Sequence, residues 1–208
     1  LAPGVDFPAA LVDGLRARLA EERPHAMANV DLIVNTRRME RRLTQIFAEG
    51  PPGFLPRIRL ITDLETLVPG ISLPPATPSL RRRLALIELL SKLLDADSKL
   101  APRAALYALS DSLASLFDEM QGEGVSVTDI LDLDVSDQSG HWERAQQFLN
   151  IAHGYLGQTI SEPDAETRQR QLVLRLIAHW QENPPQTPLI LAGSTGSRGT
   201  TSMLMHAI

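Results

Sequence analysis

Glycine, serine and threonine follow an apolar segment near the end of the chain, in the stretch LILAGSTGSRGTT. A strand that ends in such a loop and continues as a helix is a common phosphate site, because the free N–H groups at the helix start point at the anion. A nucleotide loop of the GxxxxGK[ST] type also needs a lysine for the outer phosphates. This loop has none, since the two lysines of the chain, Lys92 and Lys99, lie in its middle part.

Two interpretations of this loop stay open. It is either a flexible turn with a Ser/Thr cap, or a site for another kind of phosphate, such as that of a nucleic-acid backbone. In the second case the side chains that would bind it are Ser197, Arg198 and Thr200.

A second cluster is the stretch NTRRMERR. Thr36 can cap a helix, which places Arg37 and Arg38 in its first turn and Arg41 one turn later. Cations at this positive end of the helix dipole are mildly unfavourable, by about 0.3–1 kcal/mol each, unless an anion binds there. The cluster therefore favours an anion site. The alternative is a solvated face on which Glu40 pairs with neighbouring arginines.

Other chemistries find little support in the residue types. The chain has no cysteine, which excludes disulfides, thiolate zinc sites and cysteine-ligated iron–sulfur clusters within these residues. Asp118, Glu119 and Glu123 lie close together without a further ligand, so no metal site is expected. The histidines are scattered and form no Ser–His–Asp arrangement. We therefore expect no catalytic residue, metal or cofactor in this part of the protein.

The net charge and the hydropathy of the chain limit the kinds of partner that it can bind. The formal net charge is −5, so no overall positive field attracts nucleic acid, and contact must come from local clusters. No apolar stretch approaches the 18 or so residues of a membrane span, so no membrane contact is expected.

The elements that position the two clusters alternate between strand and helix. The apolar run at 30–35 predicts a buried strand, and the segments 57–62 and 189–192 are also expected to be strands. Helices are expected from an N-cap at Asp6 to about Glu22, and again after Thr36. This order predicts an α/β fold with a parallel sheet covered on both faces. Both clusters would then follow strands at the same carboxyl edge, where ligands bind in such folds.

The middle of the chain is expected to be an all-helical subdomain at 79–183, inserted into a discontinuous α/β domain made of 1–78 and 184–208. The apolar stripes that predict its helices are Leu80, Leu84, Ile87, Leu90 and Leu94; Leu106, Leu109, Leu113, Leu116, Phe117 and Met120; Trp142, Ala145, Leu149, Ala152 and Leu156; and Val173, Leu176 and Trp180. Because the chain begins at Leu1 and ends within the apolar pattern MLMHAI, we expect a piece of a longer protein.

Five segments together resemble one family. They are PGVDFPAALVDGLRARL, VNTRRMERRL, GPPGFLPRIRLITDL, ASLFDEMQGEGV and LILAGSTGSRGTTSMLM, which cover the chain in order. They resemble the start of AddB, the B subunit of the bacterial AddAB helicase–nuclease that repairs double-strand breaks, in its alphaproteobacterial form. The resemblance implies a RecA-like sheet of the P-loop type with a degenerate nucleotide site and an inserted helical subdomain. It also implies a cytoplasmic protein with two partners, single-stranded or duplex-end DNA and an AddA-type motor subunit in a heterodimer.

By position, the resemblance places the stretch around Thr36 at a helicase segment that contacts single-stranded DNA. We predict that Thr36, Arg37, Arg38 and Arg41 bind phosphates of the DNA backbone and that the 197–200 loop is a second clamp, without ATP hydrolysis. Two alternatives remain. One is an enzyme with an unconventional phosphate loop, and the other is a protein-interaction module without a ligand.

Overall fold

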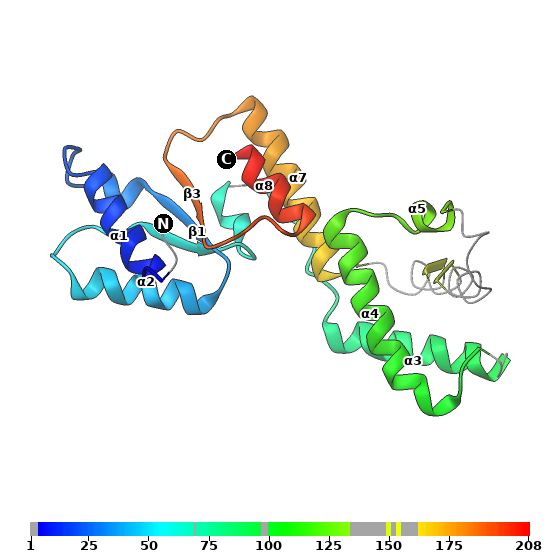
Figure 1. The fold of residues 1–208 in the computed structure, drawn as a ribbon. Helices are drawn as coiled ribbons and strands as arrows, with labels where there is room; N and C mark the ends of the chain where they lie inside the picture. Colours follow the sequence, from blue (N-terminus) through cyan, green and yellow to red (C-terminus); the bar gives the residue numbers. More distant parts are fainter. Residues whose placement is uncertain (1–3, 69, 97–99, 134–148, 151–152, 155–161) are drawn as a thin grey trace. The chain divides into compact units, whose positions relative to one another are not determined.

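The computed structural model describes residues 4–68, 70–96, 100–133, 149–150, 153–154 and 162–208 (Figure 1). The chain divides into two compact units. The first gathers Leu1–Ile71, Val173–Ser197 and Thr201–Ile208, and the second gathers Ser72–Leu172 and Arg198–Thr200. The boundary between Leu172 and Val173 falls within the helix Ala165–Glu182. The sequence, in contrast, led us to expect that all of 79–183 belongs to the insertion.

A three-stranded parallel sheet forms the centre of the first unit. Strands β1 (Asp31–Val34), β2 (Arg57–Leu60) and β3 (Leu189–Ala192) lie in the order β2-β1-β3. Leu32 and Ile33 of the central strand point to opposite faces and are both fully buried, so both faces are covered. The mixed α/β class and the parallel sheet are therefore confirmed.

Helices α1 (Phe7–Arg18) and α2 (Arg37–Glu49) pack on one face of this sheet. Asp6 caps α1 as expected, with its side chain accepting from the Ala9 N–H at 3.4 Å. The expected end near Glu22 is wrong, because α1 stops at Arg18, Leu19 is its C-cap, and the chain continues as turns to Glu22. The core that these helices form with the strands consists of Val12, Leu15, Leu32, Val34, Leu43, Phe47, Leu60 and Ala192.

Short 3₁₀ turns complete the connections of the first unit. η1 (Ala26–Asn29) leads into β1, and η2 (Leu64–Leu67) follows β2. Leu64 is fully buried and ties η2 to the core. The segment 71–78 that follows contains several prolines and has no regular structure.

The second unit is built on α3 (Ser79–Ala96) and α4 (Leu106–Glu123), which pack against each other after a turn of η3 (Arg103–Ala105). The expected stripe of α3 is partly wrong, because Leu80 and Leu84 are 64% and 56% exposed. Arg82 lies inward instead, where it pairs with Asp118, and the leucines of the first turns point outward. The buried leucines of α3 are Leu86, Leu89, Leu90 and Leu94.

Glycine ends α4. Gly124 is the C-cap with φ +75°, a left-handed conformation that glycine adopts without strain. A short helix, α5 (Val127–Leu131), follows with a reciprocal cap between Ser126 and Asp129. The apolar stripe expected on α4 faces the core except at Leu116, whose exposed fraction is 40%.

The third expected stripe lies mostly outside the described residues. Only Leu149 of its members is described, and it is buried in the core of the second unit. The members that lie outside are Trp142, Ala145, Ala152 and Leu156.

The last helices are α7 (Ala165–Glu182) and α8 (Gly199–Ala207). Val173, Leu176 and Trp180 of the fourth stripe are all buried, which confirms that stripe. In the part of the chain that the structure describes, no helix combines the length and the apolar character needed to cross a membrane.

Candidate nucleic-acid interface

The ends of β1 and β3 meet at the carboxyl edge of the sheet. The Asn35 side-chain amide, directly after β1, donates to the Gly193 carbonyl directly after β3, at 2.6 Å. Gly193 has φ +77°, and a Cβ there would lie 3.2 Å from Met39 Cε, so glycine allows the two loops to approach. The expectation that both loops start at one edge is confirmed.

The first turns of α2 present a basic surface beside this contact. Thr36 caps α2, because its hydroxyl accepts the Met39 N–H at 3.2 Å. Arg37, Arg38 and Arg41 are exposed, and among the described residues none of the three has an ion-pair or hydrogen-bond partner for its side chain. These three are called the α2 arginines below.

The structure does not contain the alternative arrangement, a solvated face on which Glu40 pairs with neighbouring arginines. Within the described ranges Glu40 makes no ion pair. Among the described residues, Arg42 is the one arginine of the cluster with a carboxylate partner, and its Nη2 lies 3.1 Å from Asp6 Oδ2. The positive charge at the start of α2 is therefore uncompensated within the described part of the protein.

In the second clamp, at 197–200, the expectation for Thr200 needs correction. Thr200 is 5% exposed, and its hydroxyl donates to the Gly122 carbonyl at 2.8 Å, so it is not offered to a phosphate. Arg198 Nη1 lies 3.0 Å from Glu166 Oε1. Ser197 is exposed, with no hydrogen bond to its hydroxyl among the described residues.

The N–H group at the start of α8 is occupied as well. Gly199 donates its backbone N–H to both carboxylate oxygens of Glu123, at 3.1 and 3.0 Å. A carboxylate of the chain itself therefore takes the position in which a phosphate loop would hold its anion. In the sequence, Glu123 stands out only as an acidic neighbour of Asp118 and Glu119, because nothing local to either segment relates two residues 76 positions apart.

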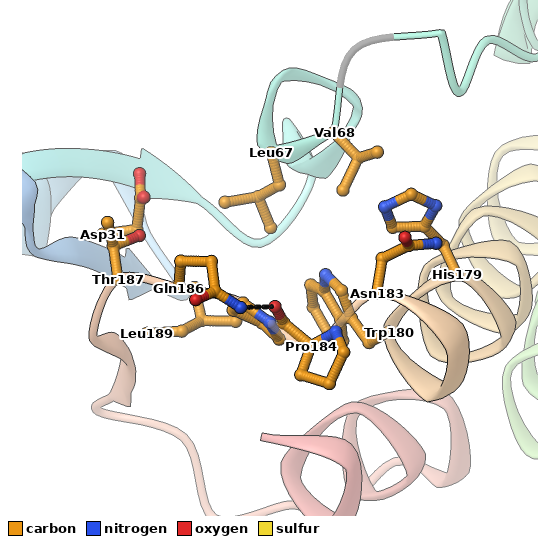
Figure 2. A pocket seen from close by; sticks show the side chains of 11 residues that line it. Asp31, Leu67, Val68, His179, Trp180, Asn183, Pro184, Gln186, Thr187 and Leu189 are labelled. Carbon is orange, nitrogen blue, oxygen red and sulfur yellow. Dashed lines mark hydrogen bonds between the residues drawn. The ribbon is translucent and has the colours of Figure 1, made fainter.

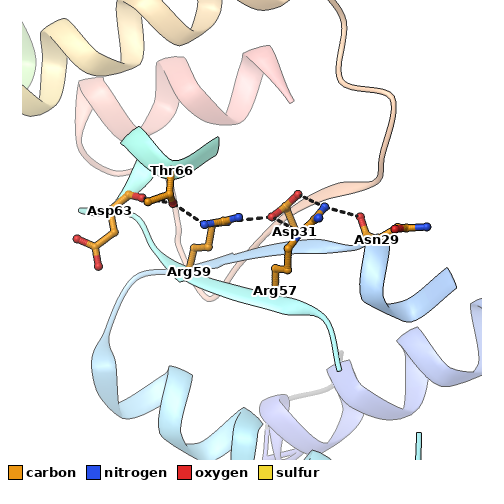
Figure 3. Close-up of polar contacts among 6 residues, drawn as sticks. All are labelled: Asn29, Asp31, Arg57, Arg59, Asp63 and Thr66. Atoms are coloured by element: carbon orange, nitrogen blue, oxygen red, sulfur yellow. Dashed lines mark hydrogen bonds and ion pairs between the residues drawn. The ribbon is translucent and has the colours of Figure 1, made fainter. Parts of the chain in front are cut away.

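A buried carboxylate that the sequence reading missed lies at the opposite edge of the sheet (Figure 3). Asp31 pairs in register with Arg57 on β2 and accepts a forked pair of hydrogen bonds from its guanidinium, at 3.0 and 2.7 Å. Arg59 Nε also donates to Asp31, at 2.9 Å, and the guanidinium of Arg59 contacts Thr66 of η2. Alternation along RIRL puts both arginines on one face, a signal that could have revealed the cluster.

A cavity of about 300 Å³ opens near the same edge (Figure 2). Its wall combines Trp180, His179 and Asn183 of the α7 end with Asp31 and Leu189 at the strand starts. Ligands in open α/β sheets bind at the carboxyl ends of strands, whereas this cavity lies at the amino ends. The Asp31 carboxylate in this wall already accepts hydrogen bonds from Arg57 and Arg59, and Arg59 contacts Thr66. These contacts hold β1, β2 and η2 together.

The described residues offer no metal centre, since no group of three or more His, Cys, Asp or Glu side chains gathers among them. At the start of α5, hydrogen bonds of the Ser126 side chain, and secondarily of the Ser126 N–H, hold the pKa of the Asp129 carboxyl below its ordinary value. No protein-family model matches the chain, and no curated protein matches it in sequence.

Proposed function

We propose that this chain is the inactivated helicase-like part of an AddB-type subunit, with a RecA-like sheet and a helical insertion. In this role it binds single-stranded DNA by its phosphates and docks an AddA-type motor subunit, in the cytoplasm, without hydrolysing ATP. The proposal rests on the five segments that resemble the AddB family and on the surface at the start of α2.

One observation carries the DNA-binding part. The α2 arginines are unpartnered within the described residues, whereas arginines such as Arg42, Arg57 and Arg83 pair with carboxylates. Positive charge at a helix start is unfavourable for the isolated helix and becomes favourable when an anion binds. Phosphate contacts of this kind fix the register of a nucleic acid without reading its sequence.

The occupied start of α8 supports the absence of nucleotide chemistry. A nucleotide loop offers free N–H groups and a lysine to the phosphates. Here the loop lacks lysine, and the Gly199 N–H binds Glu123. An enzyme acting on phosphoesters through this loop would have to displace a carboxylate first, so we place this alternative behind DNA binding.

The test is fluorescence anisotropy of labelled single-stranded DNA with the full chain, repeated from low to moderate salt. Single-strand binding weakens with salt with a slope of about −0.7 per neutralised phosphate, so Arg37→Ala/Arg38→Ala should flatten the slope by about 1.4. The matched control is Arg81→Ala/Arg83→Ala, which removes the same charge from two exposed arginines that are already paired.

An equal effect of both double variants would contradict a DNA site at α2, because it would reduce binding to net charge. Absence of DNA binding by the chain and by its complex with a motor subunit would favour the interaction module. A labelled ATP analogue is titrated in parallel, and saturable binding lost in Arg198→Ala would favour the enzyme.

A further inference from the structure

The second unit contains a cavity that the proposed function does not use. It measures about 320 Å³ and lies where α4 ends and the chain turns into α5, two helices drawn in green in Figure 1. Its polar lining consists of Gln121, Ser126, Thr128, Asn150, His153 and Arg170. None of the described residues that line it is acidic.

Arg170, on α7, has an unmet hydrogen-bonding group in this lining. Its Nη1 is buried and has no hydrogen-bond partner among the residues that the structure describes. The carboxylate one turn earlier on the same helix, Glu166, is the natural i, i+4 partner of Arg170, but it pairs with Arg198 instead. Buried polar atoms without a hydrogen-bond partner are rare in proteins, so this nitrogen atom requires an explanation.

The backbone is shaped to admit the guanidinium. A Cβ at Gly124 would lie 2.1 Å from Arg170 Nη2 and 2.2 Å from its Cζ, so only glycine leaves room for it. The negative end of the α4 dipole favours a cation at this place. These features explain why the guanidinium is seated here, but they supply no acceptor for Nη1.

Further donors line the same cavity. The hydroxyls of Ser126 and Thr128 lie 2.6 Å apart, and the Ser126 Oγ also accepts the Asp129 N–H. The nearby Asp129 carboxylate is turned to the Ser126 N–H, at 2.7 Å, and does not line the cavity. His153 adds an imidazole, which is exposed and can donate from either ring nitrogen.

We propose that this cavity binds the phosphate group of a small molecule, with Arg170 as the principal donor. A guanidinium presents its N–H groups as a fork that matches the oxygens of phosphate, and Nη1 would gain the acceptor that it lacks. The volume lies near the lower end of small-molecule sites, which fits a phosphate on a short carbon skeleton. This site is independent of the α2 arginines and of DNA.

The experiment follows the backbone amides of Val125 and Ser126 by NMR in the full ¹⁵N-labelled chain. Sodium phosphate is added at constant ionic strength, balanced with sodium chloride. We expect saturable shifts of both amides, with binding at least tenfold weaker in Arg170→Gln and intermediate in Arg170→Lys. The control Arg83→Gln, which removes an exposed arginine paired with Asp111, should bind phosphate as the natural chain does.

Parallel titrations with ribose 5-phosphate and with acetate define the ligand. Tighter binding of ribose 5-phosphate than of inorganic phosphate would support a phosphorylated metabolite. Equal binding of phosphate and acetate would overturn the assignment to phosphate. Absence of saturable shifts, or shifts unchanged in Arg170→Gln, would overturn the site itself. If Arg170→Gln does not fold by circular dichroism, His153→Gln decides, because it must weaken phosphate binding severalfold for the proposal to stand.

Discussion

The backbone N–H of Gly199 donates to both carboxylate oxygens of Glu123, at 3.1 and 3.0 Å. The contact joins the start of α8 to the end of α4, and a neighbouring hydrogen bond from Thr200 to the Gly122 carbonyl reinforces it. The resulting clasp consists of Gly122, Glu123, Gly199 and Thr200. The loop after β3 has the sequence pattern of a phosphate site, and the clasp explains why this loop is closed in the structure.

Gly199→Ala should open this clasp. The new Cβ would lie 2.9 Å from Glu123 Oε2 and 3.2 Å from its Cα, so the backbone must move and the hydrogen bonds are lost. We expect a loss of about 1–3 kcal/mol in the free energy of unfolding, measured by urea titration. The control is Gly14→Ala in α1, where nothing lies within 4 Å and alanine should stabilise by about 0.5–1 kcal/mol. Equal signs for the two variants would contradict the clasp.

Asp31→Asn should destabilise the first unit. The substitution leaves the guanidinium groups of Arg57 and Arg59 without their counter-charge, and the Asp31 side chain is 11% exposed. We expect a cost of roughly 1.5–3 kcal/mol, read from the urea midpoint. Asp111→Asn, which removes the partner of Arg83 in an exposed pair, should cost less than about 1 kcal/mol. A smaller effect for Asp31→Asn than for Asp111→Asn would refute this role.

Two adjacent arginines of α2 should behave differently. Arg42→Gln removes the pair with Asp6, the N-cap of α1, and should cost about 0.2–1 kcal/mol with little change in DNA affinity. Arg41→Gln should leave stability within about 0.5 kcal/mol and weaken DNA binding. Thermal unfolding and DNA anisotropy on both variants check the contrast. It fails if the two substitutions change DNA affinity alike.

Acid should release the cap of α5. Hydrogen bonds from Ser126, first of its side chain and then of its N–H, hold the pKa of Asp129 below its ordinary value. A carboxyl whose pKa is depressed by folding stabilises the fold above its unfolded-state pKa, and this stabilisation is lost as the pH falls through the folded-state pKa. An NMR titration of the Asp129 carboxyl should show the low pKa, and Ser126→Ala should raise it. An unchanged pKa in Ser126→Ala would show that the cap is not its cause.

Local patterns were sufficient to predict the sheet and its flanking helices. The three strands of the sheet lie within the predicted segments, and Asp6 and Thr36 cap the helices that they precede. The leucine-rich α3 was harder, because leucines occur on more than one face, and the pairing of Arg82 with Asp118 decides which face is inside. The Glu123–Gly199 contact was beyond local reasoning, since it depends on tertiary packing between segments distant in sequence.

The parallel pairing of β1 with β3 has a consequence for synthesis. Asn35 and Gly193, which close the two strand ends, are 158 positions apart. At ribosomal rates of about 5–20 residues per second, β1 waits roughly 8–30 s for its second neighbour. The intervening helices α3 and α4, whose contacts are short in sequence, are made and can fold in that interval. During that time the edge of β1 that β3 later covers exposes unpaired backbone groups, so this edge is where a nascent chain would be most open to chaperones or to mispairing.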